Sequence, residues 1–209
     1  MSVRFPWKRF WCPTDGKITL EETGFLSDPE SEYAEYCDFD VVSFDKINKI
    51  PCLILLGEPG IGKTYSIYDE INSLKITSEG KENSILLVEL KKYGSEDRLE
   101  RDICNSKQWK DFKKANHNLY LFLDGLDEVR FRIDNVSSLL LSILEKAPIE
   151  RLFLRISCRT AEWPSSFEVN LKDLWKNNQE NNVKAFEIAP LRECDVHEAA
   201  KMCRKKPLF

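Results

Sequence analysis

The feature that most constrains how this chain can fold is the stretch 53–64, whose sequence is LILLGEPGIGKT. It opens with an apolar run typical of a buried strand, and beyond it apolar residues recur at helical spacing. A loop of the pattern G-x-x-x-x-G-K-[ST] between a buried strand and a helix is a phosphate-binding loop. We therefore expect phosphate to be bound by Gly57, Glu58, Pro59, Gly60, Ile61, Gly62, Lys63 and Thr64.

Each residue type in this loop has a physical reason to be there. Glycines let the backbone curl until its N–H groups point inward at phosphate oxygens, and the following helix adds the positive end of its dipole. Lys63 is expected to reach the β- and γ-phosphates, and the Thr64 hydroxyl to ligate Mg²⁺. The alternative is a Gly/Pro turn that joins a strand to a helix and binds no phosphate.

From residue 50 onward, strand-like and helix-like patterns alternate, which predicts an α/β fold with a parallel sheet covered by helices. The expected strands are 52–56, 84–90, 119–123, 151–157 and 183–188. The expected helices are 62–74, 95–115 in one or two pieces, 134–147 and one from about 193, with a helix or loop at 171–176 and a surface loop at 177–182. Residues 1–45 are too short for a core of their own, so we expect them to be a lead-in that packs on the nucleotide domain.

Composition narrows the function classes. The net charge of −4 argues against a chain that binds polyanions as a whole, although the basic and aromatic segment 4–11 leaves a nucleic-acid contact as an alternative to packing. Seven cysteines without a C-x-x-C pair, two histidines and no signal peptide indicate free thiols in a reducing cytoplasm rather than a zinc site. No apolar run approaches the roughly 20 residues that span a bilayer, so no membrane partner is expected.

A second group of residues completes a nucleoside-triphosphate site. Asp124 ends the apolar run 119–123, where an acid next to a phosphate loop can hold Mg²⁺ through its water shell. Asp127 or Glu128 could orient and deprotonate the attacking water, and the residue pattern does not choose between them. Their alternative reading is a solvated turn that leads into the next helix.

Arg159 follows the fourth expected strand. Carboxyl ends of strands line the ligand crevice of an open α/β sheet, so its guanidinium is expected to contact the γ-phosphate and report its presence. The alternative is an arginine paired in a salt bridge at a strand end.

These motifs carry a resemblance to a known family. Residues 57–64, then LFLDGLDE at 121–128, then Ser157-Cys158-Arg159 and Trp163-Pro164, resemble the NACHT branch of the STAND P-loop ATPases, over about residues 45–200. The resemblance implies ATP or ADP and Mg²⁺ as cofactors, and a five-stranded parallel sheet in the order 5-1-4-3-2 with helices on both faces. It also implies a nucleotide-dependent switch, from a closed monomer to a homo-oligomer in the full-length protein, within an intracellular sensor, often one of phage infection.

The resemblance divides the chain into a lead-in at 1–45, a nucleotide-binding domain at 46–190 and the start of a helical domain at 191–209, after which we expect it to be truncated. An [NT]-K-x-D motif is absent, which favours ATP over GTP. Slow ATP hydrolysis is the expected activity. A non-hydrolysing nucleotide-binding or interaction fragment is the alternative. An AAA+-type remodelling ATPase ranks lower, because Gly125 follows Asp124 where that class places a second acid.

Overall fold

The computed structural model describes residues 5, 7–32, 40–77, 83–176 and 182–203. The chain divides into two compact units, one made of residues 1–48 and 186–209 and the other of residues 49–185. The expected surface loop at 177–182 lies, except for Asn182, outside the described residues.

The strands are hydrogen-bonded in the order β2-β1-β7-β3-β6-β5-β4. The expected five strands are β3, β4, β5, β6 and β7, and their order in the sheet is the expected 5-1-4-3-2. The expectation of a parallel five-stranded sheet is wrong, because the sheet has seven strands and is mixed. The two additional strands come from the lead-in segment, where β1 has four residues and β2 two, too few for periodicity to predict them.

The unit of residues 49–185 is built around parallel strands that pair as β3-β6-β5-β4. Their bounds are Cys52–Leu56 for β3, Leu152–Cys158 for β6, Leu119–Asp124 for β5 and Ser84–Glu89 for β4, and β7 spans Val183–Ile188. Leu55 lies beside Ser157 and Leu123 beside Ile156. The carboxyl ends of three neighbouring strands therefore meet at one edge of the sheet.

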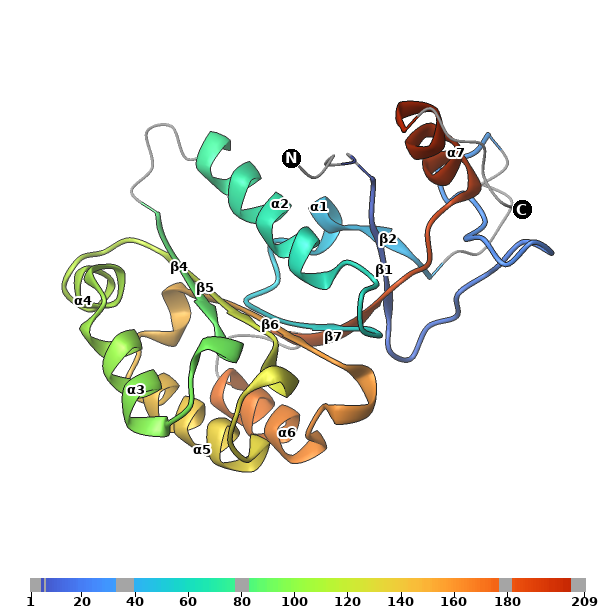
Figure 1. Cartoon of the computed structure of the whole chain (residues 1–209). Coiled ribbons are helices and arrows are strands. Elements are labelled where there is room, and N and C mark those ends of the chain that lie inside the picture. The colour runs from blue at the N-terminus through green and yellow to red at the C-terminus, as the bar shows by residue number, and fades with distance from the viewer. Residues whose placement is uncertain (1–4, 6, 33–39, 78–82, 177–181, 204–209) are drawn as a thin grey trace. The chain divides into compact units, whose positions relative to one another are not determined.

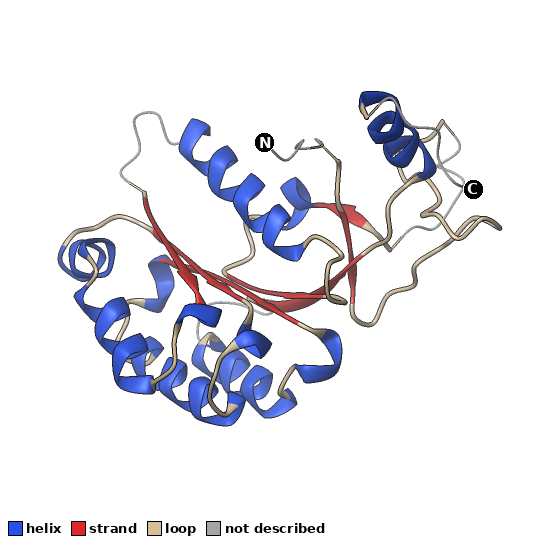
Figure 2. Ribbon diagram, in the orientation of Figure 1, coloured by secondary structure: helices blue, strands red, loops and turns tan. Residues whose placement is uncertain are grey.

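Helices cover both faces of these strands, as Figures 1 and 2 show. One face carries α2 (Lys63–Thr77), and the other carries α3 (Glu96–Asn105), α4 (Lys107–Lys114), α5 (Ile133–Leu144) and α6 (Ser165–Leu174). The expected helical region 95–115 is two helices, because the Ser106 hydroxyl accepts a hydrogen bond from the Trp109 N–H and begins a new helix. Short 3₁₀ turns occupy Leu90–Lys92, Leu126–Glu128, Ile149–Arg151 and Thr160–Glu162.

Strand alternation decides which side chains enter the main core. Leu121 and Leu123 of β5, with Leu154 and Ile156 of β6, belong to the core cluster that α3, α5 and α6 also supply. The intervening residues point to the opposite face of the sheet, and among them is the fully buried Arg155. Polar groups on that face therefore need partners within the protein.

Arg155 finds those partners in backbone carbonyls. Its Nη1 donates to the carbonyls of Ile50 at 2.8 Å and Leu154 at 3.0 Å, which ties β6 to the chain that leads into β3. Burial lowers the pKa of the guanidinium to about 10, and the nearby Glu70 carboxylate acts in the opposite direction. Arg155 is thus still a cation at neutral pH.

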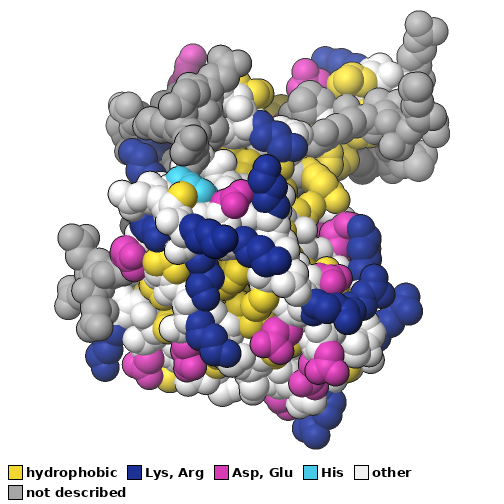
Figure 3. Space-filling model, turned by 90° about the vertical axis from the view of Figure 1, so that its left-hand side faces the viewer, with side chains coloured by type: hydrophobic (Ala, Val, Ile, Leu, Met, Phe, Trp, Pro, Cys, Tyr) yellow, Lys and Arg dark blue, Asp and Glu magenta, His cyan; other side chains and the backbone are white. Residues whose placement is uncertain are grey.

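Helix α4 separates apolar and basic side chains. Trp109 and Phe112 are buried on one side, whereas its lysines are exposed on the other: Lys107, Lys110, Lys113 and Lys114. Lys and Arg side chains gather on the face shown in Figure 3. The apolar face supplies the packing that holds so short a helix in place.

The unit of residues 1–48 and 186–209 joins the two ends of the chain. Strand β1 (Phe10–Pro13) pairs antiparallel with β2 (Val42–Ser43) and with the second half of β7. Its helices are α1 (Phe44–Ile47) and α7 (Glu193–Met202). Its small core contains Phe10, Cys12, Leu26, Val41 and Ala189. In the part of the chain that the structure describes, no helix has the length and apolar character needed to cross a bilayer.

Candidate nucleotide site

The glycine-rich loop connects the end of β3 to the start of α2. Gly60 and Gly62 have φ angles of 77° and 111°, in a region that residues with a Cβ rarely adopt. A Cβ added at either position would meet nothing within 4 Å, so backbone conformation rather than space requires glycine there. The sequence thus bends into a loop at the point where the apolar strand ends.

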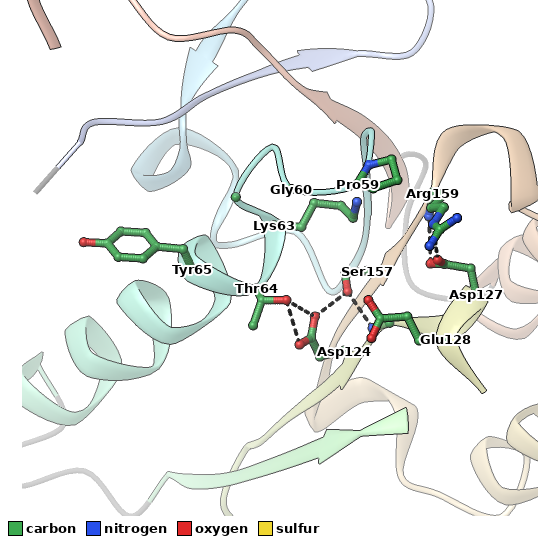
Figure 4. Close-up of a pocket in the computed structure, with 12 residues that line it drawn as sticks. Pro59, Gly60, Lys63, Thr64, Tyr65, Asp124, Asp127, Glu128, Ser157 and Arg159 are labelled. Carbon is green, nitrogen blue, oxygen red and sulfur yellow. Dashed lines mark hydrogen bonds and ion pairs between the residues drawn. The ribbon is translucent and has the colours of Figure 1, made fainter. Parts of the chain in front are cut away.

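Lys63 is the first residue of α2, and its side chain folds back over the loop. Its Nζ donates to the carbonyl of Gly57 and, at 3.1 Å, to the carbonyl of Glu58. The ammonium group lies within the pocket that the loop borders (Figure 4). An ammonium in such a position can bind an anion that enters the pocket.

Thr64 and Asp124 lie together at the base of the same pocket (Figure 4). The Thr64 hydroxyl lies 2.9 Å from Asp124 Oδ2 and 3.1 Å from Oδ1. Ser157, at the end of β6, donates to Asp124 Oδ1 at 2.6 Å and accepts the Gly125 N–H at 2.8 Å. A carboxylate that is 6% exposed is therefore satisfied by hydroxyl donors.

Asp127 and Arg159 form a pair across the strand ends. Arg159 Nε lies 2.8 Å from Asp127 Oδ2, and the Arg159 backbone N–H donates to Oδ1 at 2.9 Å. The Asp127 side chain is 5% exposed and that of Arg159 is 48% exposed. Asp127 thus binds both the main chain and the side chain of Arg159, while much of the guanidinium remains open to solvent.

Glu128 is exposed and borders the pocket opposite the glycine loop. The pocket has a volume of about 310 Å³ and carries both cationic and acidic groups. Its lining residues are Pro59, Gly60, Gly62, Lys63, Thr64, Tyr65, Asp124, Gly125, Asp127, Glu128, Ser157 and Arg159. A pocket with charges of both signs suits an anion that arrives with a counter-cation.

The structure thus brings most of the expected site residues into one pocket. Gly57, Glu58 and Ile61 do not line it, although the first two accept hydrogen bonds from Lys63. Cys158, between Ser157 and Arg159, is buried in the core, and burial together with Asp127 raises its thiol pKa to about 12. It is therefore a neutral packing residue at neutral pH.

Three lining residues were not among the expected site residues, namely Tyr65, Gly125 and Ser157. Ser157 is polar at the end of a strand that runs between β3 and β5, so the strand order places it between the loop and Asp124. The expected 5-1-4-3-2 order contained this signal, because it puts the fourth strand between the first and the third. Tyr65 follows the loop directly, but a tyrosine at that position does not by itself predict a place in the pocket.

Fold and site together define a class of protein. A glycine-rich loop between a central strand and a helix faces an acid at the end of a neighbouring strand, which is the arrangement of a P-loop NTPase-like α/β core. No group of three or more His, Cys, Asp or Glu side chains arranged to hold a metal occurs among the residues described.

Comparisons with known proteins add a distant likeness. No protein-family model and no curated protein matches the chain. Among solved structures, the RuvB Holliday junction branch migration motor of Thermotoga maritima is 16% identical, with a TM-score of 0.42, covering 74% of this chain and 44% of that one. A point-substituted variant of the same RuvB gives the same identity and coverage and a TM-score of 0.41.

Rif2 of Saccharomyces cerevisiae is 15% identical, with a TM-score of 0.39, covering 78% of this chain and 59% of that one. The chain therefore spans less than half the length of the RuvB chains and about three-fifths of Rif2.

Proposed function

We propose that the chain binds ATP with Mg²⁺ and hydrolyses it slowly, as a nucleotide-dependent switch. The observation that carries this proposal is the pair of Thr64 and Asp124, whose oxygens lie 2.9 Å apart beneath the Lys63 ammonium. A hydroxyl, a carboxylate and an ammonium at the mouth of a glycine loop match the needs of a triphosphate and its cation.

The donor set suits Mg²⁺. Magnesium prefers oxygen ligands and keeps several waters, so one hydroxyl and one carboxylate from the protein are sufficient. Thr64 and Asp124 would hold it, and when bound it would neutralise charge on the phosphates. Lys63 would turn from the loop carbonyls toward the β- and γ-phosphates, because a phosphate oxygen is the stronger acceptor.

The geometry supports different roles for the two candidate acids, Asp127 and Glu128. The Asp127 carboxylate already binds both the side chain and the backbone N–H of Arg159, so it is best suited to orient that arginine. Glu128 is exposed at the pocket and is the carboxylate better placed to orient an attacking water. Arg159, with about half of its side chain exposed, would contact the γ-phosphate.

A finer assignment rests on the motif resemblance alone. The D-G-h-D-E block at 124–128 and the S-C-R block at 157–159 support a NACHT-type STAND ATPase, acting as the switch of an intracellular sensor of the kind that often detects phage infection. In such a sensor the ATP-bound full-length protein would form a homo-oligomer. Gly125 directly after Asp124 argues against an AAA+-type remodelling enzyme.

One observation favours a second candidate, a nucleotide-binding or interaction module without turnover. Several polar groups of the pocket already have partners within the protein: Lys63 binds loop carbonyls, Thr64 binds Asp124, and Asp127 binds Arg159. These contacts satisfy Lys63, Thr64 and Asp127 without a ligand, so nucleotide must compete with them.

Equilibrium binding of fluorescent ATP to the purified chain tests the proposal, with Lys63→Ala and Lys113→Ala compared. Lys63→Ala is expected to weaken binding about 100-fold, the worth of charge-assisted hydrogen bonds to phosphate. Lys113 is an exposed lysine of α4 outside the pocket, so its loss is expected to change nothing. Absence of binding by the unmodified chain would remove the ATPase proposal, and binding without phosphate release would favour the module.

A further inference from the structure

Ser157 occupies the junction between two strand ends in the candidate site. Its side chain is buried, with the residue 1% exposed, and its hydroxyl lies 2.6 Å from Asp124 Oδ1 and 2.8 Å from the Gly125 nitrogen. We infer that Ser157 is a positioning residue, which holds the Asp124 carboxylate in the orientation that binds Mg²⁺. This inference rests on the proposed function and assigns a role that the motif pattern left open.

The direction of each hydrogen bond follows from the chemistry of the groups. A serine hydroxyl has one hydrogen, and a backbone N–H can only donate. Ser157 Oγ must accept from Gly125, so its own hydrogen points at Asp124 Oδ1. The 2.6 Å distance lies in the range of an O–H donor to an ionised carboxylate.

This hydrogen bond decides which carboxylate oxygen faces the pocket. The terminal torsion of an aspartate is broad, so an unrestrained carboxylate can turn through a wide range. With Oδ1 held by Ser157, Oδ2 stays 2.9 Å from the Thr64 hydroxyl. The two oxygens proposed to hold Mg²⁺, one on α2 and one on β5, are thereby kept together by a residue of β6 (Figure 4).

Gly125 makes the arrangement possible. Its φ angle of 76° lies in the left-handed region that glycine adopts readily, and its N–H, immediately after Asp124, donates to Ser157. A Cβ on Gly125 would lie 3.1 Å from the Glu128 side chain. The Gly125 N–H thus sets the direction of the Ser157 hydroxyl hydrogen, and the missing Cβ leaves room for Glu128.

Magnesium dependence of nucleotide binding tests the inference. The affinity for fluorescent ATP is measured with excess EDTA and across a Mg²⁺ titration, for the unmodified chain, Ser157→Ala and Ser157→Cys. Ser137→Ala serves as a matched control, because Ser137 is a buried serine of α5 that bonds a carbonyl in its own helix. Thermal unfolding of each variant confirms that it is folded.

Both Ser157 variants are expected to raise the Mg²⁺ concentration for half-maximal enhancement of binding about tenfold, with affinity in EDTA unchanged within about twofold. Cysteine preserves the volume but is a weak donor, so it separates the hydrogen bond from packing. Ser137→Ala is expected to match the unmodified chain.

The inference is overturned if Ser157→Ala shows the unmodified Mg²⁺ dependence, or loses affinity equally in EDTA and in Mg²⁺. It is also overturned if Ser157→Cys behaves as the unmodified chain, because volume would then suffice. If the unmodified chain binds no nucleotide under either condition, the proposed function fails and this inference with it. If the unmodified chain binds nucleotide in a Mg²⁺-dependent way and Ser157→Ala does so equally well, this inference fails and the proposed function stands.

Discussion

An arginine lies at the centre of each of two regions of this molecule, and the two are surrounded differently. Arg192, just before α7, contacts Asp195 at 2.8 Å, Asp28 at 3.1 Å and Glu30 at 3.4 Å, and its guanidinium lies 5.1 Å from the Phe10 ring centre. Its side chain is 13% exposed, and bonds to Asp195, against the effect of burial, raise its pKa.

Arg159 is surrounded far less completely. Among the residues that the structure describes, Asp127 is its one carboxylate partner, and the side chain is 48% exposed. Arg192 thus uses its N–H donors to join segments that are distant in sequence, so its role is to stabilise the fold. Arg159 retains donors toward a pocket, and this is what a phosphate-binding arginine requires.

The largest expected effect is a loss of ATP turnover when an acid of the pocket is substituted. Glu128→Gln removes the carboxylate proposed to orient water and is expected to lower ATP turnover about 1,000-fold with binding retained. Asp127→Asn, which alters the partner of Arg159, is expected to lower turnover by about tenfold or less. Phosphate release at saturating ATP measures both, and the reverse ranking would make Asp127 the base.

On the structural side, Arg192→Gln is expected to lower the free energy of unfolding by about 2 kcal/mol, because it leaves Asp195, which is 5% exposed, without its cationic partner. Arg159→Gln is expected to lower it by less, about 0.5 kcal/mol, because the Arg159 side chain is 48% exposed and the buried Asp127 carboxylate keeps the hydrogen bond from the backbone N–H of residue 159. Urea denaturation of both variants provides the measurement. Equal losses would erase the distinction between the two arginines.

Arg159 and Arg192 are also expected to differ in how their substitution changes the preference for ATP over ADP. Arg159→Gln is expected to reduce the preference for ATP over ADP about tenfold, since a contact with the γ-phosphate alone is lost. Competition of ATP and ADP against one fluorescent nucleotide measures the ratio. Arg192→Gln serves as the control, with an unchanged ratio expected, and an unaltered ratio in Arg159→Gln would contradict a γ-phosphate role.

The smallest expected effect comes from a buried acid on α2. Burial raises the pKa of Glu70, partly opposed by Arg155, and its Oε1 lacks a hydrogen-bond partner among the residues described. A raised folded-state pKa means that Glu70 favours the folded state at low pH, and that this contribution is lost as pH rises through the folded pKa.

Glu70→Gln is therefore expected to raise the free energy of unfolding by about 1 kcal/mol near neutral pH, with no gain below the unfolded pKa of about 4.3. Urea denaturation across pH checks this, with the exposed Glu145→Gln as control. A gain that persists at low pH would assign the effect to the amide side chain rather than to the lost charge.

Much of the site was predictable because its signals are local. The apolar run 53–56, the glycine loop and the recurring residues of α2 lie next to one another in the chain, so their spacing alone predicts strand, loop and helix. Asp124, at the end of β5, could be predicted in the same way, because it directly follows an apolar run. The start of α6 at Ser165 was missed, because the expected segment 171–176 contains only the end of that helix.

Local patterns in the sequence predict the phosphate-loop motif, the strands that border the pocket and the acids at their ends, because periodicity and motif spacing act over a few residues. Three further features appear only in the folded chain: Asp127 holds Arg159, Ser157 joins Asp124 to Gly125, and β1 and β2 make the sheet mixed. Those contacts depend on which strand ends become neighbours and on backbone turns between them. Distances of this kind are set by packing of the whole chain, and spacing along the sequence does not encode them.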